Sequence, residues 1–596
     1  MFERKTIAVI STLVLLAWTH VGSAAELKDN WGDFLHYAMI GRFDLAKAHA
    51  EAILEGPADP AALFSLAEES PREYQILLRV REAKSDPELA AVADRILALI
   101  EQGRQARRSD AKVVIEEVNR LLTTTTERGR LLAIRRLQDS GEYAVPFLLD
   151  ALADPSQQER LDRIVEALPQ IGTPAIRPLG AAIQAGSAAV RAEVARAMGK
   201  IGSLEVLPYL KYAVENDKVD EVQRVAALSI RQVDPTAMNR SAAALFFQSA
   251  EQYYSRVDSV ATGAGEAGST NMWLWDKDPQ RLAYRAVDSR IFNELMAMRC
   301  CEWALRADGT FGQAIGLWVA SFLKAEAVGV AMPDYFGDRH ADAFVYATTA
   351  GPEYLHQALA RALRDKDAAV ALGAIEALIV TAGEKSIFTA VGSMQPLLQA
   401  LTFSDRAVRY SAAIAVATAG PRGALIESRV VVQNLAEAVA VSLEPNAPAD
   451  LKAGEYALRS GDAMLRLAEQ RNTAFDLSMA QAALVRATQS GPTELKVLAG
   501  QVLAYQATAP AQQAIADIAL KADNDQDTRI AAFGSLAVSA KINGSLLTDQ
   551  TVDALYGLIQ SGDTAPELRT AVATAFGALN LPSRKVKDLI LDQAKD

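Results

Sequence analysis

Cysteine and histidine are scarce in this sequence. The 596 residues include two cysteines, Cys300 and Cys301, and five histidines. Adjacent cysteines cannot build a disulfide framework, because a disulfide between neighbours closes a small, strained ring. We therefore expect both to be small buried side chains on a helix. A redox or metal role is the alternative, although no further cysteine exists to complete such a site.

Strong catalytic motifs are also missing. There is no phosphate-binding Gly-Lys-Ser/Thr loop, no Gly-x-Gly-x-x-Gly that opens a helix, and no Gly-x-Ser-x-Gly nucleophile elbow. The sequence therefore predicts a non-catalytic protein that carries no cofactor.

Basic residues are fewer than acidic ones. The chain has 61 lysines and arginines against 73 aspartates and glutamates, a formal charge of −12, and only 6% aromatic residues. An acidic protein repels phosphate backbones, and no basic stripe with interleaved aromatic residues offsets this repulsion. We do not expect nucleic acid as a partner.

Long apolar runs are absent beyond the N-terminus. Residues 1–25 have the pattern of a secretory signal peptide: Arg4 and Lys5, a 12-residue mainly apolar stretch over 7–18, and small residues up to Ala25. Twelve helical residues reach about 18 Å, which is short for a bilayer. We expect an exported protein, periplasmic or extracellular and without stable membrane insertion after cleavage. An uncleaved anchor is the alternative.

A repeated glycine marks the part of the chain that follows residue 127. Gly141, Gly172 and Gly202 each open a similar segment, and they lie 31 and 30 residues apart. Alanine, leucine, arginine and glutamate, all strong helix formers, fill the intervals. A period of this size with helical patterning is typical of a stacked-helix solenoid, whose extended surface makes binding the expected function.

These units resemble the HEAT family in its short bacterial form, the PBS-lyase HEAT-like repeats. The first helix of each unit carries a proline near its start, namely Pro146, Pro178 and Pro208. The second helix opens on a charged loop and carries Arg191 or Arg224. The resemblance covers about 127–233 and 352–592, and it implies that this arginine bonds a loop aspartate of a neighbouring unit.

HEAT-like hydroxylases with a di-iron centre use repeated His-Glu pairs, and this chain has no such dipeptide. That activity is therefore not expected. The repeat also resembles that of bilin lyases, but no other feature of the sequence supports that activity.

Two further segments resemble tetratricopeptide hairpins. Residues 26–56 have the spacing of one such unit, with a turn at Gly41, and residues 297–323 have similar spacing. The predicted fold class is all-α, an alpha-alpha superhelix of HEAT-like units with an irregular central helical insertion. The predicted segments are a signal peptide at 1–25, tetratricopeptide-like hairpins at 26–126, HEAT-like repeats at 127–233, the insertion at 234–352 and C-terminal HEAT-like repeats at 353–596.

The insertion holds four of the six tryptophans between residues 273 and 318. It contains a Gly-rich loop over 258–270, and after this loop we expect a helical run that carries Arg281 to Arg299. Tryptophan, tyrosine and arginine concentrate in protein-binding hot spots. The predicted partner-binding residues are Trp273, Trp275, Arg281, Tyr284 and Arg285. Packing of these aromatic residues against the solenoid is the alternative.

A second loop of the insertion carries several metal-ligand side chains. Asp334, Asp338, His340 and Asp342 lie within nine residues, and carboxylates with imidazole suit a divalent metal. Solvated loop charges are the alternative.

The sequence as a whole predicts an exported scaffold that binds protein partners on a solenoid surface. An enzyme or metal-binding protein with its site at 258–342 is one alternative. A self-assembling envelope component is the other.

Overall fold

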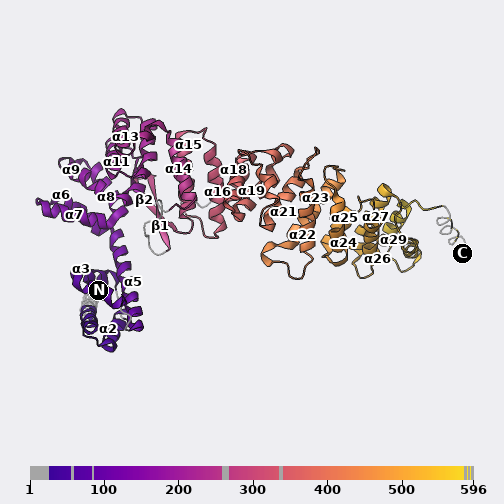
Figure 1. Ribbon diagram of the computed structural model, residues 1–596, viewed down its shortest axis with the longest axis horizontal. Helices are drawn as coiled ribbons and strands as arrows, with labels where there is room; N and C mark the ends of the chain where they lie inside the picture. The colour runs from indigo at the N-terminus through magenta and orange to yellow at the C-terminus, as the bar shows by residue number, and fades with distance from the viewer. Residues whose placement is uncertain are drawn as a thin grey trace, which may run out of the picture. The chain divides into compact units, whose positions relative to one another are not determined.

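The chain folds into two compact units. In the computed structural model, the described residues are 26–55, 59–82, 86–257, 268–278, 280–333, 340–582, 587 and 591. The first unit comprises residues 1–296 with 332–335, and the second comprises 297–331 with 336–596. The five predicted segments remain a prediction. Figure 1 shows the course of the chain in colour from its N-terminus to its C-terminus.

The first unit begins with a helix over residues 26–39. Its further helices and strands are α2 Phe43–Glu55, α3 Pro60–Glu69, α4 Pro71–Glu82, α5 Pro87–Ser109, α6 Ala111–Thr123, α7 Glu127–Ser140, the 3-10 turn η1 Gly141–Tyr143, α8 Ala144–Ala153, α9 Leu161–Gln170, α10 Ile176–Ala182, α11 Ala188–Ile201, α12 Leu207–Asn216, α13 Asp220–Val233, α14 Ala242–Tyr254, β1 Ser269–Lys277 and β2 Gln280–Asp288.

The boundary between the units falls inside α15 Phe292–Ala307. The second unit contains α16 Gln313–Ala327, α17 Ala343–Ala350, α18 Pro352–Asp365, α19 Ala368–Thr381, α20 Pro396–Ala400, α21 Arg406–Ala419, α22 Ser428–Val441, α23 Ala453–Glu469, α24 Gln481–Ser490, α25 Thr493–Leu503, α26 Ala509–Leu520, α27 Gln526–Asn543, α28 Asp549–Gln560 and α29 Pro566–Ala578.

Helices of the second unit stack in two layers. Helices α19, α21, α23, α25, α27 and α29 contact one another in succession, and so do α22, α24, α26 and α28. Each helix thus packs against the helix two places further along the chain, which is the arrangement of a HEAT-repeat helical solenoid. The predicted fold class is thus confirmed. No helix among the described residues combines the length and the apolar character that a membrane crossing requires.

The repeated glycines are backbone devices of the first unit. Gly141, Gly172 and Gly202 end the second helix of successive repeats with φ values of 58°, 79° and 75°. Side chains disfavour this half of backbone space, whereas glycine adopts it readily. The chain can therefore end one helix and begin the next short turn within two residues. Because each helix pair ends at such a glycine, the glycines recur with the period of the helix pairs.

Arg191 confirms the structural role implied by the HEAT resemblance. Its Nε and Nη2 donate to the two carboxylate oxygens of Asp217 at 2.7 and 2.9 Å, and its Nη1 donates to the carbonyls of Ala185 and Gly186. The side chain thus ties α11 both to the loop before it and to the loop after α12.

Arg224 does not make the same contact. Its guanidinium pairs with Glu221, one turn earlier on α13, and both side chains are exposed. The expectation of an inter-repeat bond was wrong here, because the neighbouring carboxylate at i−3 on the same helix satisfies the charge locally.

Later repeats use the arginine in the same way as Arg191. Arg409 donates to the carbonyls of Phe403 and Ser404, Arg529 to that of Ala519, and Arg569 to three carbonyls in the loop before α29. Carbonyls in the last turn of a helix and in the loop after it lack intrahelical partners, and these arginines supply donors for them.

Two other sequence predictions are confirmed. Residues 26–39 and α2 form a helical hairpin whose turn contains Gly41 at φ 75°, and Trp31 is buried in its core. Cys300 and Cys301 lie buried on α15. Burial raises the pKa of Cys300 to about 12, so its thiol stays protonated and packs as a small hydrophobic group.

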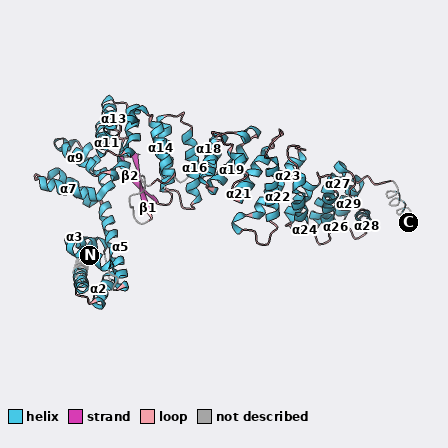
Figure 2. Ribbon diagram, viewed as in Figure 1, coloured by secondary structure: helices cyan, strands magenta, loops and turns pink. Residues whose placement is uncertain are grey.

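The predicted helix over 280–299 is wrong in its first half. Residues 280–288 form strand β2, which pairs with β1 in the one sheet found among the described residues (Figure 2). Arg281 and Arg285 are four residues apart, a spacing that places side chains on one face of a helix and equally on one face of a strand. The arginine spacing therefore could not distinguish the two, and the β-favouring Trp-Leu-Trp segment opposite decided it.

Gly172→Ala is expected to lower the free energy of unfolding by about 1–3 kcal/mol. Gly172 has φ 79° and ψ −151°, and no neighbour lies closer than 4.0 Å to an added Cβ, so backbone strain alone carries the cost. Urea unfolding measures it. Gly32→Ala, on an exposed position of the first helix, is the control and should be neutral or stabilising. Equal losses in both variants would contradict this account of the repeat turn.

His356 on α18 should make the second unit sensitive to acid. It is fully buried, its Nε2 lies 3.1 Å from the Ser386 Oγ, and burial lowers its pKa from 6.5 to about 4. Between these pH values the unfolded chain binds a proton that the folded chain does not, so stability falls as pH decreases through this window. From pH 7 to pH 5, unfolding experiments should show wild type losing about 2 kcal/mol more than His356→Gln. If His356→Gln loses as much stability as wild type over this range, the burial of His356 is not the source of the acid sensitivity.

Candidate functional site

The strands β1 and β2 form an antiparallel hairpin with two chemically different faces. The pairing runs from Ser269 opposite Asp288 to Lys277 opposite Gln280. Because successive side chains of a strand alternate between faces, Trp273, Trp275 and Tyr284 share one face. Arg281 and Arg285 share the other. The five predicted partner-binding residues therefore lie on one hairpin but do not form one continuous face.

The aromatic face is anchored to the repeats by one carboxylate. Glu142 of η1 accepts a hydrogen bond from Trp273 Nε1 on one oxygen and from Asn271 Nδ2 on the other, each at 2.8 Å. Asn271 Nδ2 also lies 2.8 Å from the Tyr143 hydroxyl. Hydrogen bonds to an ionised acceptor are about twice as strong as neutral ones, so Glu142 fixes the position of the hairpin.

Three aromatic rings pack around this anchor. The Trp273 and Tyr284 ring centroids are 5.1 Å apart, and the Tyr143 ring meets Tyr284 edge-on at 5.5 Å. Desolvation raises the pKa of Tyr143, so its hydroxyl stays protonated at neutral pH. Trp273 is only 5% exposed, which matches the packing alternative for this residue.

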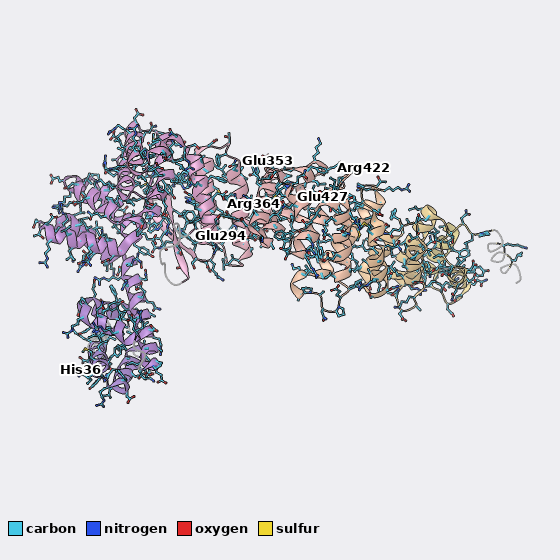
Figure 3. All side chains as sticks on the ribbon, in the orientation of Figure 1. His36, Glu294, Glu353, Arg364, Arg422 and Glu427 are labelled. Atoms are coloured by element: carbon cyan, nitrogen blue, oxygen red, sulfur yellow. The ribbon has the colours of Figure 1, made fainter. Side chains whose placement is uncertain are left out.

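A second set of contacts lies beside the open end of the hairpin, where Ser269 pairs with Asp288. The Ser289 amide donates to the Gly268 carbonyl at 3.0 Å. Arg256, just after α14, donates through Nη2 to the Arg290 carbonyl and to Glu294 on α15, at 3.0 and 2.9 Å. Glu294 is fully buried in the first unit and is labelled in Figure 3. The Glu142 anchor and these contacts thus hold the hairpin near the open end of its strands.

The exposed side chains lie mainly on β2. Arg281, Tyr284 and Arg285 are exposed, and Trp275 is half-buried. Tyr284 is 40% exposed although its ring packs against two others. Protein interfaces favour tyrosine and arginine, and β2 exposes Tyr284 on one face and the two guanidinium groups on the other.

The backbone of the hairpin adds a second binding element. The sheet has two strands within the described residues, so each strand is paired on one side only. Thr270 to Trp273 of β1 are buried, whereas most of β2 is exposed. An exposed unpaired strand can accept an extended segment of another chain through main-chain hydrogen bonds.

The predicted metal ligands are not assembled by the described residues. Asp334 and Asp338 lie outside them. His340 Nδ1 is 2.9 Å from the Ala341 carbonyl, and Asp342 accepts from the Val345 amide as the N-cap of α17. No group of three or more metal-ligand side chains that could hold an ion occurs in the described ranges. The metal site remains a sequence prediction.

Glu142, Tyr143 and Asn271 were not predicted from the sequence, although they build the anchor. A signal was present in the repeat itself. The positions after the repeated glycine are Thr173-Pro174 and Ser203-Leu204 in the other units, and only the first unit has a carboxylate and a phenol there. The departure from the repeat pattern marks a position with its own contact.

Comparison with known protein families supports the repeats in one part of the chain. Residues 145–231 match the family model for HEAT repeats. No match is found among curated proteins. Solved structures with similarity include an engineered protein, at 18% identity over 78% of this chain and 99% of that one, with a TM-score of 0.25.

Two further similar structures are of natural proteins. Kap95p, whose binding to RanGDP was studied, is 13% identical over 88% of this chain and 69% of its own, with a TM-score of 0.28. She4p is 12% identical over 92% and 83%, with a TM-score of 0.30. Scores this low carry no argument about function.

Glu142→Gln should release the hairpin from the repeats. The amide keeps one acceptor oxygen and presents its NH2 to a second donor, so docking should weaken by about 2 kcal/mol. Amide hydrogen exchange over residues 269–288 should then be about 30-fold faster, and trypsin should cut faster after Arg281 and Arg285. Glu221→Gln, an exposed change on α13, is the control. Unchanged exchange in Glu142→Gln would contradict the anchor.

Proposed function

We propose that this protein is a non-catalytic scaffold that binds protein partners through the β1–β2 hairpin. The observation that carries the proposal is the docked hairpin, which interrupts the helical repeat and presents Arg281, Tyr284 and Arg285 on one exposed strand. A helical solenoid supplies an extended rigid frame, and rigid elements place contact residues with little loss of entropy on binding.

The chemistry of β2 favours an extended, acidic partner segment. Such a segment can add to the unpaired edge of β2 through its backbone, and its carboxylates can pair with the exposed guanidinium groups. Tyr284 offers a large ring that is already positioned by Tyr143 and Trp273. The arginines also keep two copies of this hairpin from pairing with each other, because like charges would then face one another.

We also propose that the protein is exported from the cytoplasm. The charged, apolar and small-residue order of residues 1–25 supports export to the periplasm or the exterior. Partners would therefore be sought in the cell envelope or the secreted fraction. Cleavage of the segment is a prediction that the N-terminal sequence of the mature protein tests.

Partner binding should depend on the exposed arginines. In Arg281→Gln/Arg285→Gln, capture of envelope proteins that bind wild type should weaken at least 30-fold, since hot-spot residues contribute about 2 kcal/mol or more. Quantitative mass spectrometry after affinity capture measures this loss, and circular dichroism checks that the fold is kept.

Arg224→Gln is the matched control, because Arg224 is also an exposed arginine but lies on α13. It should retain every partner. If the double variant keeps all partners of wild type, the hairpin is not the contact. If wild type captures nothing above an unrelated bait, the scaffold proposal is wrong.

A further inference from the structure

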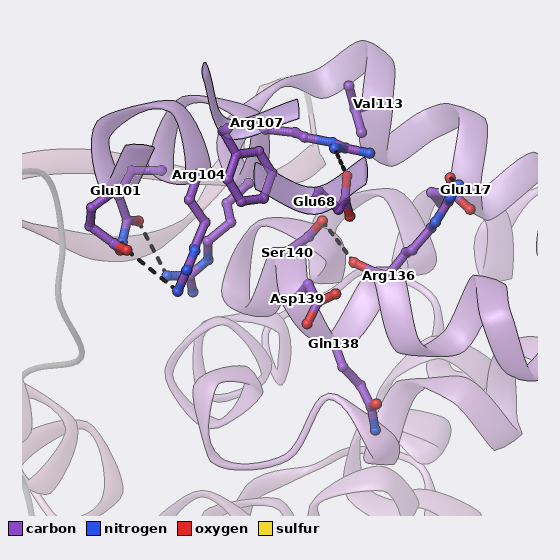
Figure 4. A pocket seen from close by; sticks show the side chains of 13 residues that line it. Glu68, Glu101, Arg104, Arg107, Val113, Glu117, Arg136, Gln138, Asp139 and Ser140 are labelled. Carbon is purple, nitrogen blue, oxygen red and sulfur yellow. Dashed lines mark hydrogen bonds and ion pairs between the residues drawn. The ribbon is translucent and has the colours of Figure 1, made fainter. Parts of the chain in front are cut away.

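A cavity of about 590 Å³ lies in the first unit, lined by residues between Phe64 and Ser140. Its lining residues belong to α3, α5, α6 and α7, and Figure 4 draws their side chains. Four arginines line it, together with one aromatic ring and the exposed Asp139. The volume is within the range of small-molecule sites.

Three of the four arginines are already neutralised. Arg104 pairs with Glu101 at 3.4 Å, and Arg107 pairs with Glu68. Arg136 donates to the buried Glu117 at 2.7 Å. The guanidinium groups of Arg104 and Arg107 also lie over the Phe64 ring, at 5.9 and 5.6 Å from its centre. These contacts build the wall and leave little free charge.

Arg108 differs from the other three. No carboxylate of the described residues pairs with it, and its Nη1 donates a hydrogen bond to the neutral Gln105 at 3.2 Å. Its Nε is buried and has no hydrogen-bond partner. Its Nη2 lies against Gly141, where a Cβ would come within 2.8 Å. A guanidinium that is half-buried without an anion is unfavourable, and an anionic ligand would remove that cost.

Asp139 is the matching group of opposite sign. It lines the same cavity and makes no ion pair within the described residues. The eight charged side chains of the wall sum to zero, so a dianion such as phosphate would be left uncompensated. A ligand with one carboxylate for Arg108 and one ammonium group for Asp139 satisfies both free charges.

We propose that this cavity binds a zwitterion of the amino-acid class, with its carboxylate on Arg108, its ammonium group on Asp139 and an apolar portion toward Phe64. A free amino acid and a short peptide share this chemistry. The volume exceeds what one amino acid fills, which favours a peptide of two or three residues.

Calorimetric titration of the full chain with the dipeptide Ala-Phe tests the proposal. Ala-Phe should bind saturably, and its C-terminal amide and its N-acetylated form should each bind about tenfold more weakly or worse. In Arg108→Gln, Ala-Phe and its C-terminal amide should bind with the same affinity. In Asp139→Asn, Ala-Phe and its N-acetylated form should bind with the same affinity.

Arg128→Gln, an exposed change on α7 outside the cavity, should preserve both differences. Asp139 is exposed, so Asp139→Asn keeps the test valid even if Arg108→Gln fails to fold. Free phenylalanine distinguishes the two sources: binding as tight as that of Ala-Phe assigns the amino acid.

Three results would overturn the proposal. The first is that neither Ala-Phe nor phenylalanine binds saturably at concentrations up to the order of 10 mM. Discrimination between acid and amide that survives Arg108→Gln is the second. Inorganic phosphate that binds as well as Ala-Phe with the same dependence on Arg108 is the third, because it would indicate a plain anion site. None of these tests requires a protein partner.

Discussion

The Glu142 carboxylate is the contact on which the exposed strand depends. A two-stranded sheet is marginal in water without a surface to pack on. Both oxygens of Glu142 accept from β1, one from Asn271 and one from Trp273. The carboxylate reaches them because Gly141 turns the chain sharply at the end of α7. The turn at Gly141 and the carboxylate of Glu142 therefore give this repeat a contact that holds the hairpin.

The repeats supply the frame for this contact. Each helix pair is closed by backbone devices: glycines at positive φ in the first unit, and arginines that donate to loop carbonyls in both. Small residues let neighbouring helices approach, since a Cβ on Gly199 would meet Ser229 at 2.6 Å. These interactions are local, so a hairpin can interrupt the series of repeats while the helix pairs before and after it keep their packing.

The hairpin and the arginine-lined cavity meet at the end of α7. Gln138, Asp139 and Ser140 line the cavity, and the next residues, Gly141 to Tyr143, hold the hairpin. Arg108 packs on Gly141 from the cavity side. Two chemically distinct surfaces thus share one short segment of backbone, so a change at this junction alters both the anchor of the hairpin and the wall of the cavity.

The sequence by itself determined the helical repeat, the N-terminal hairpin and the burial of the cysteines, because periodic apolar positions and repeated glycines act over short stretches of chain. It could not determine the strands. Arg281 and Arg285 suit a helix and a strand equally, and the choice came from the pairing of β2 with β1. Nor could it assign Trp273 to packing and Tyr284 to the surface, since only the docking of β1 on Glu142, 131 residues earlier, buries one ring and leaves the other exposed. Contacts between distant residues depend on the folded geometry, which no local pattern encodes.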